Sequence, residues 1–451
     1  MRRLIFAVIT LTLAAACAMP VAATASKAQA PSGSLTDQLK SPDAKVRAKA
    51  ARELGKEGNI SSIPALAAAL SDSEPKVRRE VVIALAQMHA PQVLEALIRA
   101  THDQDDGARM LAVKSLVGYY TGDVPKPGFT GFIKKTWKGA TAHFELDTKR
   151  IPLGIVVDPN VVTALVAVMN ANGAPHASEE AAKGLGILAA QAAVPDLVKA
   201  AHSSDSDLAL EALNSLSKIK DKSSGPQLLD LLSSPNHDIK RTACVTVGIL
   251  RANEAVPKLQ SIFESESNQK DRENALVGLA YLGQSISEPV FIKALWSHDK
   301  KLQVAAAEGL ARIADPKTLS ELEKAAITEK DGDAKLAMEF AITAVGKDTF
   351  LNDLVTELGS RTRGDVASAY LTELARNPQF LAKLYPFLQS PDATVRRRLC
   401  GVLMYSGDQS SLAQLDRLEH DPNADVAAEA LRAKQAIRAR LAPGTGVGSG
   451  I

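Results

Sequence analysis

The sequence predicts an all-α protein, an α-solenoid built from about a dozen helix-turn-helix repeats. Apolar residues recur every 31 residues, as in Val46 and Val77 and again in Val395 and Val426. A proline series keeps nearly the same interval, at Pro195, Pro226, Pro257 and Pro289. Hydrophobic residues make up 46% of the chain and aromatic residues only 4%, which is typical of tightly packed helices.

The chain starts with a segment that reads as an export signal. Arg2 and Arg3 precede an apolar run from Leu4 to Ala16, which is too short to span a bilayer as a stable helix. We expect a signal peptide at residues 1–25 and a flexible lead-in at residues 26–34.

Two processing sites compete within this segment. The stretch "LAAAC" resembles the bacterial lipoprotein box and would lead to lipidation of Cys17. Ala23-Thr24-Ala25 offers a small-x-small cleavage site instead. The expectation is an exported protein, periplasmic after cleavage behind Ala25 or membrane-anchored if Cys17 is lipidated.

Each repeat reads as two helices joined by a short turn. Apolar residues such as Val46, Ala50 and Leu54 fall on one face of the first helix, which starts near an Asp or Ser cap. The regularly spaced prolines suit the first turn of the second helix, where a missing N–H costs nothing. Glycines near the ends of the first helices let helices approach closely or stop, at Gly55, Gly186, Gly248, Gly278 and Gly309.

The repeat unit resembles a known family. Its motif D-x-x-V-R, followed by spaced Ala and Leu, appears at residues 43–47 and 392–396 and resembles the HEAT repeat. The short class found in phycobilisome lyases is the most similar. The resemblance covers residues 35–118 and 159–438, and it implies an α-solenoid whose concave surface binds other proteins. It implies no reaction, because function depends on sites rather than on folds.

An insertion interrupts the array at residues 119–158, and it could form a loop or a β-hairpin. The segment concentrates aromatic and basic residues within an otherwise aromatic-poor chain. One hypothesis makes it a partner-binding protrusion through Phe129, Phe132, Lys134, Lys135, Trp137 and Lys138. The alternative is that its aromatics pack onto the solenoid as a local core.

The cysteines, the histidines and the Gly-rich tail indicate structural roles rather than catalytic or metal-binding ones. Cys244 and Cys400 lie in apolar helical contexts several repeats apart, so we expect two buried thiols and no disulfide. Five histidines occupy turns between repeats and are too widely spaced to share a metal: His102, His202, His237, His298 and His420. The Gly-rich tail, residues 439–451, is expected to be disordered and does not fit a dinucleotide-binding loop.

The expected function is binding without catalysis. A net charge of +2 disfavours an electrostatically driven nucleic-acid binder, and no catalytic motif, metal site or cofactor site is recognisable. We expect an exported scaffold that binds a protein or peptide through its concave surface. The alternative, by analogy with bilin lyases, is a protein that binds a small ligand or a lyase-like enzyme.

Overall fold

The computed structural model describes residues 34–123, 151 and 155–442. The predicted signal peptide and Cys17 lie outside the described residues. So do the six candidate binding residues of the insertion, which are Phe129, Phe132, Lys134, Lys135, Trp137 and Lys138. Most of the Gly-rich tail also lies outside them, so its predicted disorder stays a prediction.

The described residues confirm the all-α solenoid: they form α-helices and short 3₁₀ helices, and they contain no strand. One layer consists of the long helices α2 (Ala44–Glu57), α4 (Pro75–Gln87), α6 (Asp106–Thr121), α8 (Pro175–Ile187), α10 (Ser206–Ile219), α11 (His237–Ile249), α13 (Gln269–Leu282), α15 (Lys300–Ile313), α17 (Gly332–Ala344), α19 (Gly364–Leu374), α21 (Ala393–Ser406) and α23 (Ala424–Leu441).

The second layer consists of shorter helices. After α1 (Leu35–Gln38) these are α3 (Ile63–Ala69), α5 (Val93–Ala100), α7 (Pro159–Met169), α9 (Val194–Ala201), a 3₁₀ helix (Lys222–Ser233), α12 (Val256–Ser265), α14 (Glu288–Leu295), α16 (Leu319–Thr328), α18 (Leu351–Glu357), α20 (Pro378–Leu384) and α22 (Gln409–Leu418).

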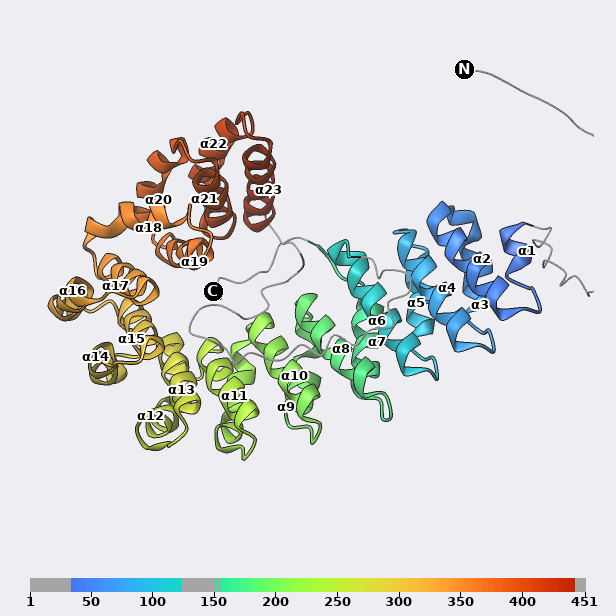
Figure 1. The fold of residues 1–451 in the computed structure, drawn as a ribbon, viewed down its shortest axis with the longest axis horizontal. Helices are drawn as coiled ribbons and strands as arrows, with labels where there is room; N and C mark the ends of the chain where they lie inside the picture. Colours follow the sequence, from blue (N-terminus) through green and yellow to red (C-terminus); the bar gives the residue numbers. More distant parts are fainter. Residues whose placement is uncertain (1–33, 124–150, 152–154, 443–451) are drawn as a thin grey trace, which may run out of the picture.

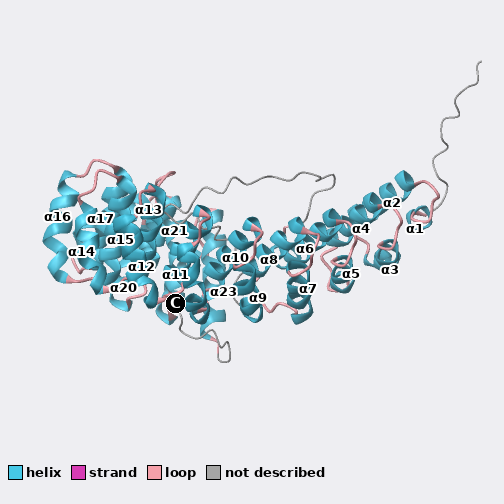
Figure 2. Cartoon of the chain, turned by 90° about the horizontal axis from the view of Figure 1, so that it is seen from below, coloured by secondary structure: helices cyan, strands magenta, loops and turns pink. Residues whose placement is uncertain are grey.

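The molecule is a hook whose inside is lined by the long helices (Figure 1). One limb runs from α2 to α11, the chain turns through α12 to α17, and α18 to α23 return toward the first limb. Figure 2 shows the same helices edge-on, as successive pairs. We call the long helices inner and the short ones outer. Neighbouring inner helices pack directly on each other, and one apolar core runs between the layers from Leu39 to Ile437.

An Arg–Asp ladder joins consecutive repeats and explains the arginine of the repeat motif. It consists of the pairs Arg47–Asp72, Arg78–Asp103 and Arg396–Asp421, each formed between one inner helix and the turn before the next. In every rung, Nε and Nη2 of the arginine donate to the two carboxylate oxygens at 2.6–2.8 Å. This bidentate geometry fixes the spacing between repeats.

Most inner helices, from α2 to α15, end at a residue in the left-handed region. Gly58, Gly122 and Gly283 take this conformation, with φ between 61° and 78°. Non-glycine residues hold the equivalent position elsewhere, at His89, Ala189, Lys220, Arg251 and Ala314. Such a residue lets the chain leave the helix and start the outer helix at once.

The predicted close approach of helices at glycine is confirmed at the crossing of α11 and α13. A Cβ added to Gly248 would lie 2.5 Å from the carbonyl oxygen of Gly278. One added to Gly278 would lie 2.3 Å from the carbonyl oxygen of Cys244. Cys244 and Cys400 are free and fully buried, as predicted.

Three details differ from the sequence-based expectation. Pro226 lies inside the 3₁₀ helix Lys222–Ser233 rather than at the start of an α-helix. Gly225 precedes it at a position where the added Cβ would lie 2.9 Å from Ala252, so the backbone passes close to the neighbouring repeat. Helix α6 continues to Thr121, inside the range given to the insertion, and α23 continues to Leu441, inside the predicted tail.

Candidate partner-binding surface

The concave surface has a floor to which each inner helix contributes one residue, nine positions after its N-cap residue. At 100° per residue this position faces away from the outer helices. We call these residues the floor residues. From the N-terminal end they are Arg52, Ile83, Lys114, Lys183, Asn214, Val245, Val277, Glu308, Phe340, Thr372, Gly401 and Arg432.

The floor is open at its two ends and closed at the bend. From α2 to α10 every floor residue except Ile83 is partly exposed, and the floor is open again from α19 to α23. Between these stretches the floor residues Val245, Val277, Glu308 and Phe340 are buried, with exposures of 1–4%. The open N-terminal stretch, from α2 to α10, is therefore the longer accessible part of the concave surface.

The first part of this stretch is basic. Lys45, Lys49 and Lys56 of α2 are exposed beside Arg52, and Lys76 of α4 continues the line. Within this basic group, Arg52 pairs with an acid of the next repeat, with its Nη2 2.5 Å from Oε1 of Glu80, and Lys56 pairs with Glu53 of its own helix at 3.0 Å. Excess positive charge on a concave wall attracts acidic partners over a Debye length.

The second part is acidic. Burial, together with the charges of Glu211 and Asp207 on α10, raises the pKa of Glu179 on α8 to about 7. Glu180 beside it is partly neutralised by Lys114, whose Nζ lies 3.6 Å away. The charge of the open stretch therefore changes from positive at α2 to negative at α8 and α10.

A polar cluster closes the floor at the bend. The hydroxyl of Tyr370 on α19 donates a buried hydrogen bond of 2.8 Å to Oε1 of Glu308 on α15. Nε and Nη2 of Arg312 donate to Glu373 at 2.9 and 3.1 Å, which also joins α15 to α19. We call Glu308, Arg312, Tyr370 and Glu373 the bend cluster.

Aromatic rings complete the closure. The ring of Phe340, the floor residue of α17, stacks on Tyr370 with a centroid distance of 4.2 Å and an interplanar angle of 2°. Arg312 also lies over the ring of Tyr281, 4.9 Å from its centroid. Helix α19 thus occupies the place that a partner would take on α15 and α17.

Electrostatics support a charged bend cluster despite its burial. Burial opposes the charge of Arg312, but Glu373 and Glu308 outweigh it and raise the pKa of the guanidinium. Burial and the charge of Glu308 raise the pKa of Tyr370 well above its usual value, so the phenol keeps its proton. The cluster therefore holds its arginine charged and its tyrosine neutral across the ordinary pH range.

The insertion is anchored at the ends of α6 and α8. The backbone N–H of Asp158 donates to the hydroxyl of Tyr120 at 3.0 Å, and the N–H of Ile151 donates to the carbonyl of Ile187 at 3.0 Å. Gly118 lets the outgoing chain turn back, because an added Cβ would lie 2.0 Å from the carbonyl oxygen of Asp123. These contacts hold the two ends of the insertion together at one edge of the solenoid.

Two of the turn histidines contact an aspartate of the next repeat. Nδ1 of His237 lies 2.6 Å from Oδ2 of Asp271, and Nε2 of His202 lies 3.1 Å from Oδ1 of Asp230. Over residues 34–123, 151 and 155–442, no three His, Cys, Asp or Glu side chains gather as metal ligands would. In the same ranges no helix is both long and apolar enough to cross a membrane.

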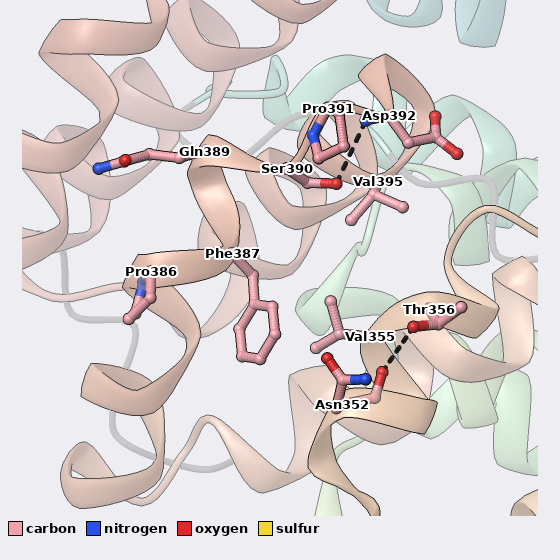
Figure 3. A pocket seen from close by; sticks show the side chains of 10 residues that line it. All are labelled: Asn352, Val355, Thr356, Pro386, Phe387, Gln389, Ser390, Pro391, Asp392 and Val395. Atoms are coloured by element: carbon pink, nitrogen blue, oxygen red, sulfur yellow. Dashed lines mark hydrogen bonds between the residues drawn. The ribbon is translucent and has the colours of Figure 1, made fainter.

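A cavity of about 360 Å³ lies in the second limb, between α18 and α21 (Figure 3). It is lined by α18, the 3₁₀ turn before α21 and α21 itself, with Val355, Phe387 and Val395 as apolar lining. Its one carboxylate, Asp392, is engaged as the N-cap of α21 and accepts from the N–H of Thr394 at 2.7 Å. The cavity therefore presents amide and hydroxyl groups beside one carboxylate that is engaged as a helix cap.

Sequence reasoning missed the bend cluster and the floor residues. Glu308 and Tyr370 lie 62 residues apart in unrelated local patterns, so no periodicity connects them. The floor residues could have been found by counting from each cap, because the caps recur with the repeat.

Comparisons with known proteins identify the repeats. A sequence model of HEAT repeats matches residues 33–117, 194–280 and 256–343, together more than half of the chain. No curated protein matches. Among solved structures, an engineered protein is 17% identical with a TM-score of 0.37, covering 90% of this chain and 98% of its own.

Two natural structures are also similar. The complex of CpcE and CpcF of phycocyanin lyase from Nostoc sp. PCC7120 is 20% identical with a TM-score of 0.35, covering 57% of this chain and 90% of that one. Escherichia coli YibA is 16% identical with a TM-score of 0.39, covering 65% and 96%. With the HEAT-repeat model matching more than half of its length, the chain belongs to the HEAT-repeat family.

Proposed function

We propose that the protein is a non-catalytic scaffold that binds a protein or peptide partner on its concave surface. The observation that carries the proposal is the floor from α2 to α10. It is lined by partly exposed polar residues, of which Lys183 and Asn214 have no partner within the described residues. A regular row of accessible side chains suits an extended or helical polypeptide better than a small molecule.

The charge pattern supports a partner with two kinds of segment. The basic part at Lys45, Lys49 and Lys56 favours an acidic segment, and the acidic part at Glu179 and Glu211 favours a basic one. Complementary charges mainly raise the association rate and set the direction in which a chain lies in the groove.

The test is photocrosslinking from the floor. A photoreactive residue at Lys183 is expected to capture a defined polypeptide in envelope extracts. The same residue at Lys293, exposed on the outer helix α14, serves as the matched control. Equal capture from both positions, or none from Lys183, would rule out the concave surface as the binding site. A coloured or fluorescent ligand that co-purifies would favour the small-ligand alternative.

We further propose that the protein is exported. The support is the sequence alone, with its paired arginines, its apolar run and two processing sites, at Cys17 and after Ala25. Mass spectrometry of the mature protein from the envelope distinguishes the sites. A first residue of Ser26 indicates cleavage, and a lipid-modified Cys17 indicates anchoring. An intact Met1 in the cytoplasmic fraction contradicts export.

A further inference from the structure

The Arg–Asp ladder provides an internal template for carboxylate binding. In a filled rung the carboxylate receives two bonds from the arginine, and a third comes from a backbone N–H two residues farther on. Asp72 accepts from Glu74 N at 2.9 Å, and Asp103 accepts from Asp105 N at 2.8 Å. The arginine always lies four residues after the N-cap of its inner helix, as Arg47 follows Asp43 and Arg78 follows Glu74.

The third rung has the arginine but not the acid. Arg109 lies four residues after the N-cap Asp105 of α6, in the same position as Arg47 and Arg78. The turn after α7 carries Asn172 where the two preceding turns carry Asp72 and Asp103. Nε of Arg109 is buried and has no hydrogen-bond partner among the described residues.

Arginines at this position elsewhere do find an acceptor. Where no acid is available, Arg272 donates its Nε to the carbonyl of Phe263 at 2.8 Å and lies over the Phe263 ring. Lys240 replaces the arginine in another repeat and reaches Glu266 at 2.8 Å. A buried guanidinium N–H without an acceptor has given up its hydrogen bonds to water and gained none in the protein. Arg109 thus differs from the other basic residues at this repeat position, because its Nε lacks an acceptor among the residues described.

The turn that carries Asn172, at the position of Asp72 and Asp103 in the repeat, is exposed. Asn172 and Gly173 are exposed, and Gly173 has φ of 77°, so the turn takes a shape that the turns at Asp72 and Asp103 do not have. Asp106, three residues before Arg109, is engaged by the next inner helix, because it accepts from Ala177 N at 3.1 Å. Arg109 is partly exposed but its Nε is buried, so a carboxylate that approaches over this turn can reach Nε only when residues of the turn shift.

We propose that Arg109 is a binding site for a carboxylate, supplied by an acidic side chain of a partner polypeptide. The planar fork of a guanidinium matches a carboxylate in two parallel hydrogen bonds, and three other rungs of this molecule hold an aspartate in that way. The site lies at the edge where outer helices turn into inner ones, away from the floor residues. It therefore does not depend on the proposed binding in the concave groove.

The test follows the Nε–H resonance of Arg109 by NMR in the full-length protein, with N-acetylaspartate amide as the probe. The resonance is assigned by its loss in Arg109→Lys. The wild type is expected to show a saturable shift. Asn172→Asp supplies the missing acid within the chain and is expected to abolish the shift and raise the unfolding temperature.

Asp103→Ala serves as the positive control, because it empties a rung that is normally filled. The probe is then expected to shift the Nε–H resonance of Arg78 as well. A response at Arg78 in this variant without any response at Arg109 overturns the proposal. So does binding that survives in Asn172→Asp, or saturation by inorganic phosphate at lower concentration than by the carboxylate. Circular dichroism confirms that each variant is folded.

Discussion

Tyr370 and Glu308 are hydrogen-bonded across the inside of the bend, at 2.8 Å and with both side chains buried. They belong to α19 and α15, so the contact passes over the concave face of α17 and skips one repeat. A regular solenoid makes contacts only between neighbours. This pair therefore holds the bend tighter than nearest-neighbour stacking alone requires.

Tyr370→Phe is expected to lower the free energy of unfolding by about 1–3 kcal/mol, because it leaves the buried Glu308 without this donor. The bend should also open, which increases the radius of gyration measured by small-angle X-ray scattering. Tyr405→Phe is the matched control, since Tyr405 is 62% exposed at the end of α21. Unchanged stability and radius in Tyr370→Phe would show that the hydrogen bond does not hold the bend.

Two glycine-to-alanine changes should have opposite effects. Gly248→Ala places a methyl group 2.8 Å from the Cα of Gly278 and should destabilise by about 1–3 kcal/mol through overpacking. Gly401→Ala meets nothing within 4 Å and should stabilise by roughly 0.5–1 kcal/mol through helix propensity. Thermal and denaturant unfolding measure both. Destabilisation by Gly401→Ala would contradict the open floor at α21.

Replacing a left-handed non-glycine residue should stabilise the chain. Ala314 has φ of 54° at the end of α15, a conformation that costs an L-residue about 1 kcal/mol. Ala314→Gly is expected to recover up to that amount in denaturant unfolding. The reciprocal change Gly283→Ala, at φ of 61°, should destabilise, because its Cβ would also lie 3.0 Å from Cβ of Arg312. Destabilisation by Ala314→Gly would contradict strain at this position.

The raised pKa of Glu179 predicts a pH dependence of stability. Its pKa is about 7 in the folded protein and 4.5 as the unperturbed value, so the folded state binds the proton more tightly than the unfolded state. The free energy of unfolding should therefore fall as pH rises from about 4.5 through 7, by at most about 3 kcal/mol.

Glu179→Gln should remove this part of the pH dependence and raise stability at pH 8. The measurement is denaturant unfolding at several pH values. Glu53→Gln is the control, because Glu53 is partly exposed and pairs with Lys56 of the same helix. Between pH 5 and 8 the free energy of unfolding should fall more for the wild type than for Glu179→Gln. An equal change in both proteins would contradict the acidic environment of Glu179.

Much of the architecture could be predicted from the sequence, because the helix caps, the apolar periodicity and the glycine positions all indicate the same helix pairs. The motif around Val46 predicted the first helix of a repeat, which the structure confirms. Gly248 and Gly278 predicted either a close helix approach or a helix end, and the structure shows the close approach. Arg47 was visible as part of the motif, but its partner Asp72 lies 25 residues away and had no separate signal. Pro226 misled, because a proline suits a 3₁₀ helix as well as the first turn of an α-helix.

The sequence by itself determined that the chain is a stack of helix pairs, because stacking requires only an apolar face that recurs with the repeat. The tertiary structure alone decided how the stack curves and which parts of its concave surface remain open. Curvature accumulates from small rotations between repeats, and these depend on contacts such as Gly248 with Gly278. The final closure depends on Glu308 and Tyr370, which come together only after the intervening repeats have turned the chain back on itself.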